Sequence, residues 1–224
     1  MRPAEALTLS QLPLFPLQTV LFPGGWLPLR IFEVRYLDMI GRCHKAGAPF
    51  GVVCLSEGSE VRQIDPTASP AGDGFAKEVF HGVGTLAHIE HLERPQPGLM
   101  VIHCRGIQRF HVTRRHRLPH GLWVADVQLD EPETVVPVPD YLDHTRSALQ
   151  RVLQSLQERH QDSLAQLPLQ APYQWDDSGW VANRWAELLP APVELKQRLM
   201  TLDNPLVRLE LVSDLLEKLG LDGR

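Results

Sequence analysis

The sequence predicts an α+β protein in which a β-rich N-terminal part is followed by a helical bundle. Over about the first 130 residues, short apolar runs alternate with polar positions, and 123–130 keeps the period of a strand buried on one face. From 140 onward the apolar residues recur every three or four positions, as on one side of a helix. Acids and prolines at 130–139 separate the two patterns. We therefore predict two parts, 1–132 and 133–224, with the second packed as an extension of the first.

The N-terminal part is expected to hold several short strands and one helix. Two apolar runs near the start contain three prolines, which places them at sheet edges or strand ends because proline cannot donate to a ladder. They cover 12–17 and 27–32 and are joined by a turn at 22–25. The helix runs from Glu33 to about Ala46, with Gly47 as its stop. Further strands are expected at 50–55, 99–104, 108–112 and 123–130.

Two glycine-containing segments qualify this picture. Gly106 between two of the expected strands indicates a bulge or a tight bend. The stretch 58–74 is rich in proline, glycine and polar residues, which is typical of an exposed loop.

Four helices are predicted in the C-terminal part. The first spans 140–160, where leucines and a valine form one stripe. A capping residue near Asp177 opens the second, and Pro192 starts the third. Asn204 and the proline after it start the fourth, which ends at Gly220.

The composition excludes several classes of protein. The chain is 43% hydrophobic and 22% charged, with a net charge of -5, as is ordinary for a soluble globular protein. No apolar run approaches the roughly 18 residues that a membrane span needs, and the first residues do not resemble a secretory signal. Three cysteines without C-x-x-C spacing favour a reducing compartment. We expect a cytoplasmic protein without a membrane partner.

One block of the sequence is strongly basic. Residues 94–125 contain six arginines and neither lysine nor acid, namely Arg94, Arg105, Arg109, Arg114, Arg115 and Arg117. Such a block can form a basic face for an acidic partner. The alternative, which we favour, is that strand alternation scatters the arginines and that they pair with carboxylates elsewhere.

Motifs for catalysis or cofactor binding are weak. Residues 82–87 match G-x-G-x-x-A, but a strand pattern follows where a phosphate site needs a helix, so we assign the glycines to a turn entering a strand. Seven of the ten histidines lie between His81 and His120. His88 and His91 would point to opposite faces of a strand and could not share a metal ion. The sequence also lacks G-x-S-x-G. We predict no catalytic residue, cofactor or metal.

The opening segments 12–17 and 27–36 resemble the start of the Lon N-terminal domain, the substrate-binding domain of ATP-dependent Lon proteases. Later landmarks of the same family lie at 49–53, 82–87 and 105–110, and the runs 180–190 and 196–199 resemble stand-alone bacterial members. The resemblance implies a PUA-like pseudo-barrel followed by a helical bundle. It also implies a role in selecting damaged or unfolded protein substrates.

Full-length Lon enzymes use a nucleotide-binding P-loop and a serine–lysine pair. This sequence has no G-x-x-x-x-G-K-[ST] and no lysine in a recognisable catalytic setting. The resemblance therefore implies the recognition domain without the ATPase and protease domains, and not an enzyme. It leaves open whether a separate ATPase or protease is recruited.

Three functional hypotheses follow, of which we favour the first. The chain is a non-catalytic module that recognises exposed or unfolded polypeptide, as a quality-control adaptor. The second hypothesis is that it binds nucleic acid, which the net negative charge disfavours. The third is that it is a small-molecule-binding protein or a cryptic hydrolase with a pocket.

Candidate partner-binding residues lie in two places. Arg30, Glu33, Arg35 and Tyr36 put polar side chains into the apolar opening, and Arg105 and Arg109 flank the Gly106 bend. For each, an Arg–Glu pair that ties the start of the helix to the sheet is an alternative to contact with a ligand.

Overall fold

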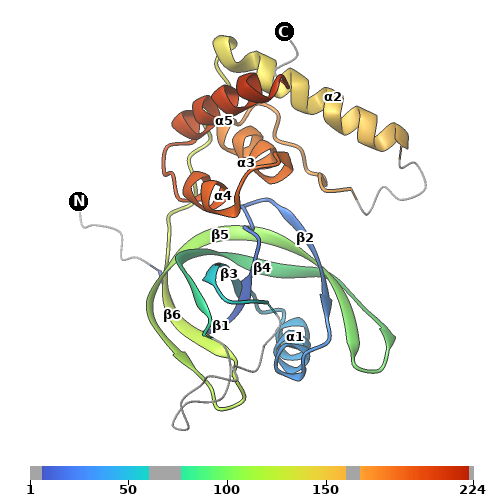
Figure 1. The fold of residues 1–224 in the computed structure, drawn as a ribbon, viewed down its shortest axis with the longest axis vertical. Helices are drawn as coiled ribbons and strands as arrows, with labels where there is room; N and C mark the ends of the chain where they lie inside the picture. Colours follow the sequence, from blue (N-terminus) through green and yellow to red (C-terminus); the bar gives the residue numbers. More distant parts are fainter. Residues whose placement is uncertain (1–6, 61–76, 160–166, 222–224) are drawn as a thin grey trace. The chain divides into compact units, whose positions relative to one another are not determined.

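The computed structural model describes residues 7–60, 77–159 and 167–221. It divides the chain into two compact units, drawn together in Figure 1. The β-rich unit contains the residues up to Leu21 together with Leu27–Glu131, and the helical unit contains Phe22–Trp26 and the residues from Pro132 onward. The α+β prediction is confirmed. The predicted loop at 58–74 lies mostly outside the described residues.

A single sheet forms the β-rich unit. Its strands are β1 (Thr8–Leu17), β2 (Trp26–Ile31), β3 (Phe50–Glu57), β4 (Val79–Gln96), β5 (Leu99–Arg117) and β6 (Trp123–Leu129). The order is β2-β5-β4-β3-β1-β6, and β5 also pairs with β6. These pairings close β1, β3, β4, β5 and β6 into a small barrel, while β2 lies at the end of the order beside β5. The β1–β3 pair is parallel, and the β1–β6, β3–β4, β4–β5 and β5–β6 pairs are antiparallel.

Glycines let the barrel close around Phe110, which is fully buried. A Cβ placed on Gly51 or on Gly84 would stand 2.8 or 2.7 Å from the Phe110 ring, so these two strand positions tolerate no side chain. Gly82 and Gly84 lie within β4, so our assignment of them to a turn before the strand was wrong. A phosphate-binding loop would need a helix directly after these glycines, and β4 continues there instead.

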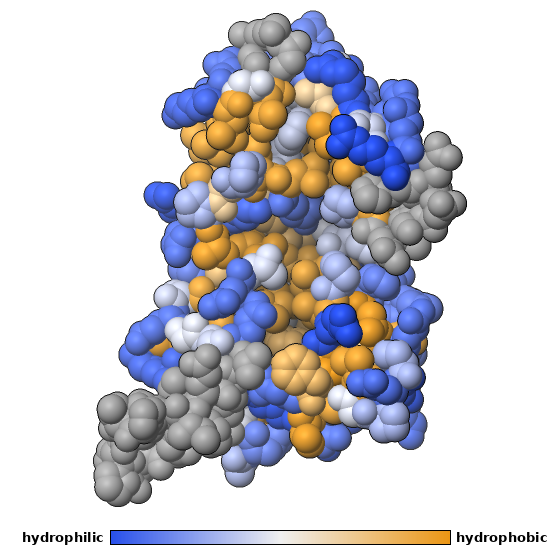
Figure 2. Space-filling view, turned by 45° about the vertical axis from the view of Figure 1, so that its right-hand side comes forward, coloured by the Kyte–Doolittle hydropathy of each residue, from blue (hydrophilic) through white to orange (hydrophobic). Residues whose placement is uncertain are grey.

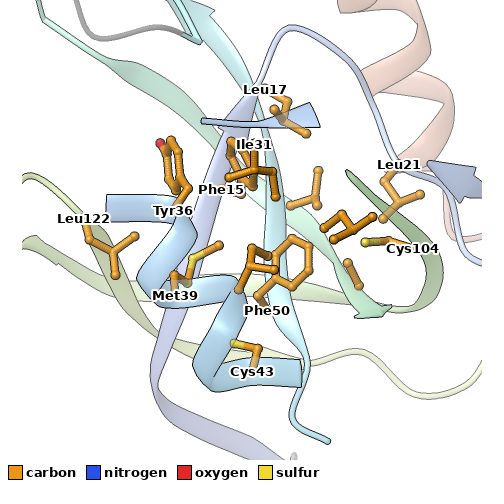
Figure 3. Packing of buried hydrophobic residues seen from close by; sticks show 14 residues of the cluster. Phe15, Leu17, Leu21, Ile31, Tyr36, Met39, Cys43, Phe50, Cys104 and Leu122 are labelled. Atoms are coloured by element: carbon orange, nitrogen blue, oxygen red, sulfur yellow. The ribbon is translucent and has the colours of Figure 1, made fainter. Parts of the chain in front are cut away.

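The helix of this unit, α1 (Val34–Ala46), closes one side of the core. Its buried face includes Tyr36, Met39, Ile40 and Cys43. Figure 3 shows Tyr36 and Phe15 side by side, and their rings stack with centroids 4.0 Å apart. Gly47 adopts a left-handed conformation (φ 60°) and ends the helix, as predicted.

Bulges interrupt the pairing of β4 with β5. One lies opposite Gly106, as predicted, between the Thr85–Arg109 and Ala87–Gly106 pairs. Another lies between Ile89 and His91.

The second bulge overturns one expectation about the histidines. His88 pairs with Arg105 and His91 pairs with His103. Because Arg105 and His103 are two positions apart on one strand, His88 and His91 lie on the same face. The bulge supplies the extra residue that strict alternation does not anticipate.

The helical unit contains a 3-10 turn at Asp140–Leu142 and the helices α2 (Asp143–Arg159), α3 (Ser178–Leu188), α4 (Val193–Met200) and α5 (Pro205–Leu219). The predicted caps are confirmed. Asp177 accepts a hydrogen bond from the Gly179 N–H, and Asn204 accepts two from the first turn of α5. Gly220 ends α5 with a φ of 66°. Within the described ranges, no helix is long and apolar enough to cross a membrane.

Candidate functional site

A small cavity of about 150 Å³ opens in the β-rich unit where β2 leads into α1. Its apolar lining comes from Phe15 and Leu17 of β1, Leu29 and Ile31 of β2, and Phe32. Its polar lining comes from Arg30, Glu33, Tyr36 and Glu60. Pockets for small-molecule ligands usually hold about 300–1,000 Å³. This cavity is therefore suited to a single amino-acid side chain rather than to a whole cofactor.

A second cavity, of about 480 Å³, lies between α1 and the tip of the β4–β5 hairpin. Apolar residues from both elements line it, namely Leu37, Pro95, Pro97, Leu99 and Met100, together with Arg94. The hairpin tip packs on the helix, since Met100 Cε lies 3.9 Å from the position that a Cβ on Gly41 would take.

Two exposed apolar side chains lie in the segment that joins the smaller cavity to Leu37 of the larger one. Phe32 keeps 56% and Val34 keeps 74% of its surface exposed. Val34 and Leu37 are three residues apart and therefore neighbours on the surface of α1. We call this set of residues the apolar band: Leu29, Phe32, Val34, Leu37, Leu99 and Met100.

Half of the apolar band is anchored to the hydrophobic core. Leu29, Leu37 and Met100 pack against the core beneath them, which fixes their positions. Figure 2 shows one face of the molecule, on which apolar and hydrophilic side chains are interspersed. Exposed apolar side chains of this kind are found at protein-interaction sites.

Three of the six predicted site residues meet at the smaller cavity. Arg30, Glu33 and Tyr36 all line it. Burial raises the pKa of Tyr36 well above its ordinary value, so its hydroxyl stays neutral and can donate a hydrogen bond.

Arg35 is not exposed at this site. Its guanidinium is buried and donates to Glu33 Oε2 (3.0 Å), to the Gly121 carbonyl (2.9 Å) and to Glu78 Oε1 (3.1 Å). The other oxygen of Glu78 accepts a hydrogen bond from Trp123 Nε1 at 2.8 Å. Arg35 thus ties the start of α1 to the sheet and orients Glu33, a residue of the cavity wall.

Arg105 and Arg109 lie on β5 and are not among the residues that line either cavity. Arg105 Nε is 3.4 Å from Glu90 Oε1, and Arg109 Nε is 3.0 Å from Asp130 Oδ2. For these two residues the predicted pairing with carboxylates is confirmed. Further along β5, the Arg115 guanidinium lies over the Phe80 ring at 4.4 Å. The arginine block is therefore divided among separate partners.

The hairpin tip and the two exposed apolar residues were missed from sequence. The only local signal is the pair of prolines followed by Leu99 and Met100, and nothing in it indicates that the tip packs on α1. Phe32 was predicted to belong to an apolar strand at a sheet edge, whereas β2 ends at Ile31 and Phe32 is exposed.

The described residues hold no group of three or more His, Cys, Asp or Glu side chains that could bind a metal ion. All three cysteines are buried, and burial raises the pKa of Cys104 to about 12, so its thiol is not a nucleophile. Ser213 Oγ lies 2.9 Å from His144 Nε2, but neither residue lines either cavity.

The decisive comparison is with protein families. Residues 11–218 match the model of the substrate-binding domain of the ATP-dependent protease La (Lon). This chain belongs to the Lon substrate-binding domain family. That domain is the non-catalytic part of Lon protease.

Solved structures agree with this assignment. The Lon N-terminal domain protein from Xanthomonas campestris is 30% identical, with 91% of this chain and 97% of that chain covered and a TM-score of 0.61. The N-terminal domain of the Mycobacterium avium complex Lon protease shares the fold at 18% identity, with 91% and 96% covered and a TM-score of 0.50. Among curated proteins, none matches the chain significantly.

Proposed function

We propose that this Lon-family chain is a non-catalytic module that binds exposed segments of unfolded polypeptide through the apolar band and its two cavities. The observation that carries the proposal is the exposure of Phe32 and Val34 beside a cavity the size of one side chain. Unfolded chains expose apolar side chains that folded proteins bury. An aromatic or aliphatic side chain of such a segment would enter the smaller cavity, and Phe32 would cover it.

The charged rim supports the same use. Arg30, Glu33 and Glu60 surround an apolar floor, and this division between a dry centre and a polar rim is typical of protein interfaces. The smaller cavity is below the usual size of a small-molecule pocket. The larger cavity is within that size range, but Arg94 and Gln96 are the only polar side chains among the residues that line it. The division of the arginines among Glu90, Asp130 and Phe80 argues against a continuous nucleic-acid surface.

The cellular role that follows is that of a cytoplasmic quality-control adaptor. The family domain selects substrates for an ATP-driven protease, and this sequence contains no P-loop motif of its own. A separate ATPase or protease would then receive the bound polypeptide.

Phe32→Ser is expected to weaken binding of a labelled, permanently unfolded polypeptide about tenfold or more, since removal of a central aromatic contact commonly costs more than 1 kcal/mol. Val34→Ser should weaken it less because the side chain is smaller. Fluorescence anisotropy of the purified protein measures both affinities, with single-stranded RNA added as a competitor.

Ile107→Ser is the matched control. Ile107 is 49% exposed on β5 and is not among the cavity-lining residues, so its replacement should leave the affinity unchanged. Equal effects of the Phe32 and Ile107 substitutions would contradict the proposed site. Absence of polypeptide binding, or its displacement by RNA at physiological salt, would contradict the proposed function.

A further inference from the structure

The smaller cavity of the β-rich unit has the size of one aromatic ring. Its volume is about 150 Å³, and a protein cavity of about this size accommodates benzene. Phe15, Leu17 and Ile31 of its lining belong to the buried core, and Leu29 packs against that core. The apolar wall is therefore fixed before a ligand enters, and a planar six-membered ring is the group that this space fits best.

Tyr36 brings a buried hydroxyl group to the same cavity. Tyr36 is 2% exposed, and its ring stacks on Phe15 and lies 4.5 Å from the Arg35 guanidinium. Figure 3 shows the hydroxyl at the end of the ring that points away from Met39. Among the described residues this hydroxyl has no hydrogen-bond partner, although a buried tyrosine usually finds one. One polar group of the cavity is thus left for a ligand to satisfy.

Two carboxylates also line the cavity, and each is held in place through one of its oxygens. Glu33 Oε2 accepts a hydrogen bond from Arg35 Nε at 3.0 Å. Glu60 Oε1 accepts one from the Gln18 N–H at 2.5 Å. Because a carboxylate offers about four acceptor positions, both residues can accept a further hydrogen bond from a ligand.

The ligand group that matches these partners both accepts and donates a hydrogen bond. The Tyr36 hydroxyl can donate to it, and the carboxylates of Glu33 and Glu60 can only accept from it. A phenol hydroxyl does both, whereas a phenylalanine ring does neither and would bury the Tyr36 hydroxyl without a partner. A lysine or arginine side chain would meet the Arg30 guanidinium, which lines the same cavity.

We propose that the smaller cavity selects tyrosine side chains of the bound polypeptide over phenylalanine side chains. The ring of the bound tyrosine occupies the apolar space, and its hydroxyl accepts a hydrogen bond from Tyr36 and donates one to Glu33 or Glu60. This selectivity rests on the proposed function and narrows it to one kind of side chain. Because burial of a hydroxyl group costs free energy, burial alone would produce the opposite preference.

Two matched polypeptides test the proposal. One is a labelled, permanently unfolded chain whose only aromatic residues are tyrosines, and the other has phenylalanine at each of those positions. In fluorescence anisotropy the wild-type protein should bind the tyrosine chain about tenfold more tightly, since an unmade hydrogen bond in a buried site changes affinity by about this factor. Equal affinities, or tighter binding of the phenylalanine chain, would overturn the proposal.

Tyr36→Phe removes the hydroxyl group and keeps the ring that stacks on Phe15. In this variant the ratio of the two affinities should fall to about one or below, because only the apolar part of the cavity remains. Tyr141→Phe makes the same change at an exposed position of the helical unit and should keep the wild-type ratio. An unchanged ratio in Tyr36→Phe would overturn the proposal.

The side-chain analogues p-cresol and toluene separate this selectivity from polypeptide binding. In amide chemical-shift titrations, p-cresol should shift the resonances of residues 29–36 at lower concentrations than toluene does. If neither polypeptide bound, the proposed function would be overturned, and a preference for p-cresol would still support the selectivity of the cavity. Binding of toluene as tight as that of p-cresol would overturn the selectivity.

Discussion

Replacing Arg208 by alanine is expected to lower the free energy of unfolding of the helical unit by about 2–4 kcal/mol, because buried hydrogen-bond acceptors lose their donor and the removed side chain leaves a cavity. Arg208 is 1% exposed. Its guanidinium donates to Glu133 Oε2 at 3.0 Å and Oε1 at 2.6 Å, and to Asn183 Oδ1 at 2.9 Å. Its Nε donates to the Leu199 carbonyl at 3.0 Å. Alanine would leave the buried Asn183 and Leu199 acceptors without this donor and create a cavity.

Urea denaturation followed by the helical circular dichroism signal measures the change. Arg198→Ala, at an exposed position on α4, is the matched control and should change stability by less than about 0.5 kcal/mol. Arg208→Lys keeps the charge but loses the forked geometry, so it should recover only part of the loss. If Arg208→Ala and Arg198→Ala had similar effects, the network around Arg208 would not be the main support of this unit.

Replacing Arg35 by alanine is expected to destabilise the β-rich unit by about 3–5 kcal/mol, because it leaves a buried carboxylate without its cationic partner. Glu78 would remain with a side chain only 5% exposed and without its guanidinium partner. The Gly121 carbonyl would also lose its donor. Trp123, which donates to Glu78, reports on this region through its fluorescence during urea denaturation.

Arg42→Ala is the control for this substitution, because Arg42 lies on the exposed side of the same helix. A double-mutant cycle with Glu78→Gln separates the pair from the packing of the arginine stem. A coupling energy near zero would mean that Arg35 acts by filling space and not by pairing with Glu78.

Local chemistry was readable from the sequence, and long-range pairing was not. The caps at Asp177 and Asn204 and the stop at Gly47 depend on neighbours within a few residues, so their types alone identify the helix ends. The attachment of β2 to β5 joins segments far apart in the chain. The bulge near His91 is one extra residue in one strand, which alternation of side chains does not reveal.

The candidate site shows the same division. Arg30, Glu33 and Tyr36 were found because polar residues interrupt an apolar segment, and all three line one cavity. Arg35 belongs to the same segment, but its partners Glu78 and Gly121 are 43 and 86 residues away, so its structural role was not visible. The second cavity depends on contact between Leu37 and the distant hairpin tip.

The central claim is that the apolar band binds unfolded polypeptide, and amide chemical-shift mapping tests it most directly. Titration of the isotope-labelled protein with a permanently unfolded polypeptide should shift the backbone resonances of residues 28–37 and 94–100, with little change along 105–117. Shifts confined to the arginine-rich stretch of β5, or to the helical unit, would contradict the account.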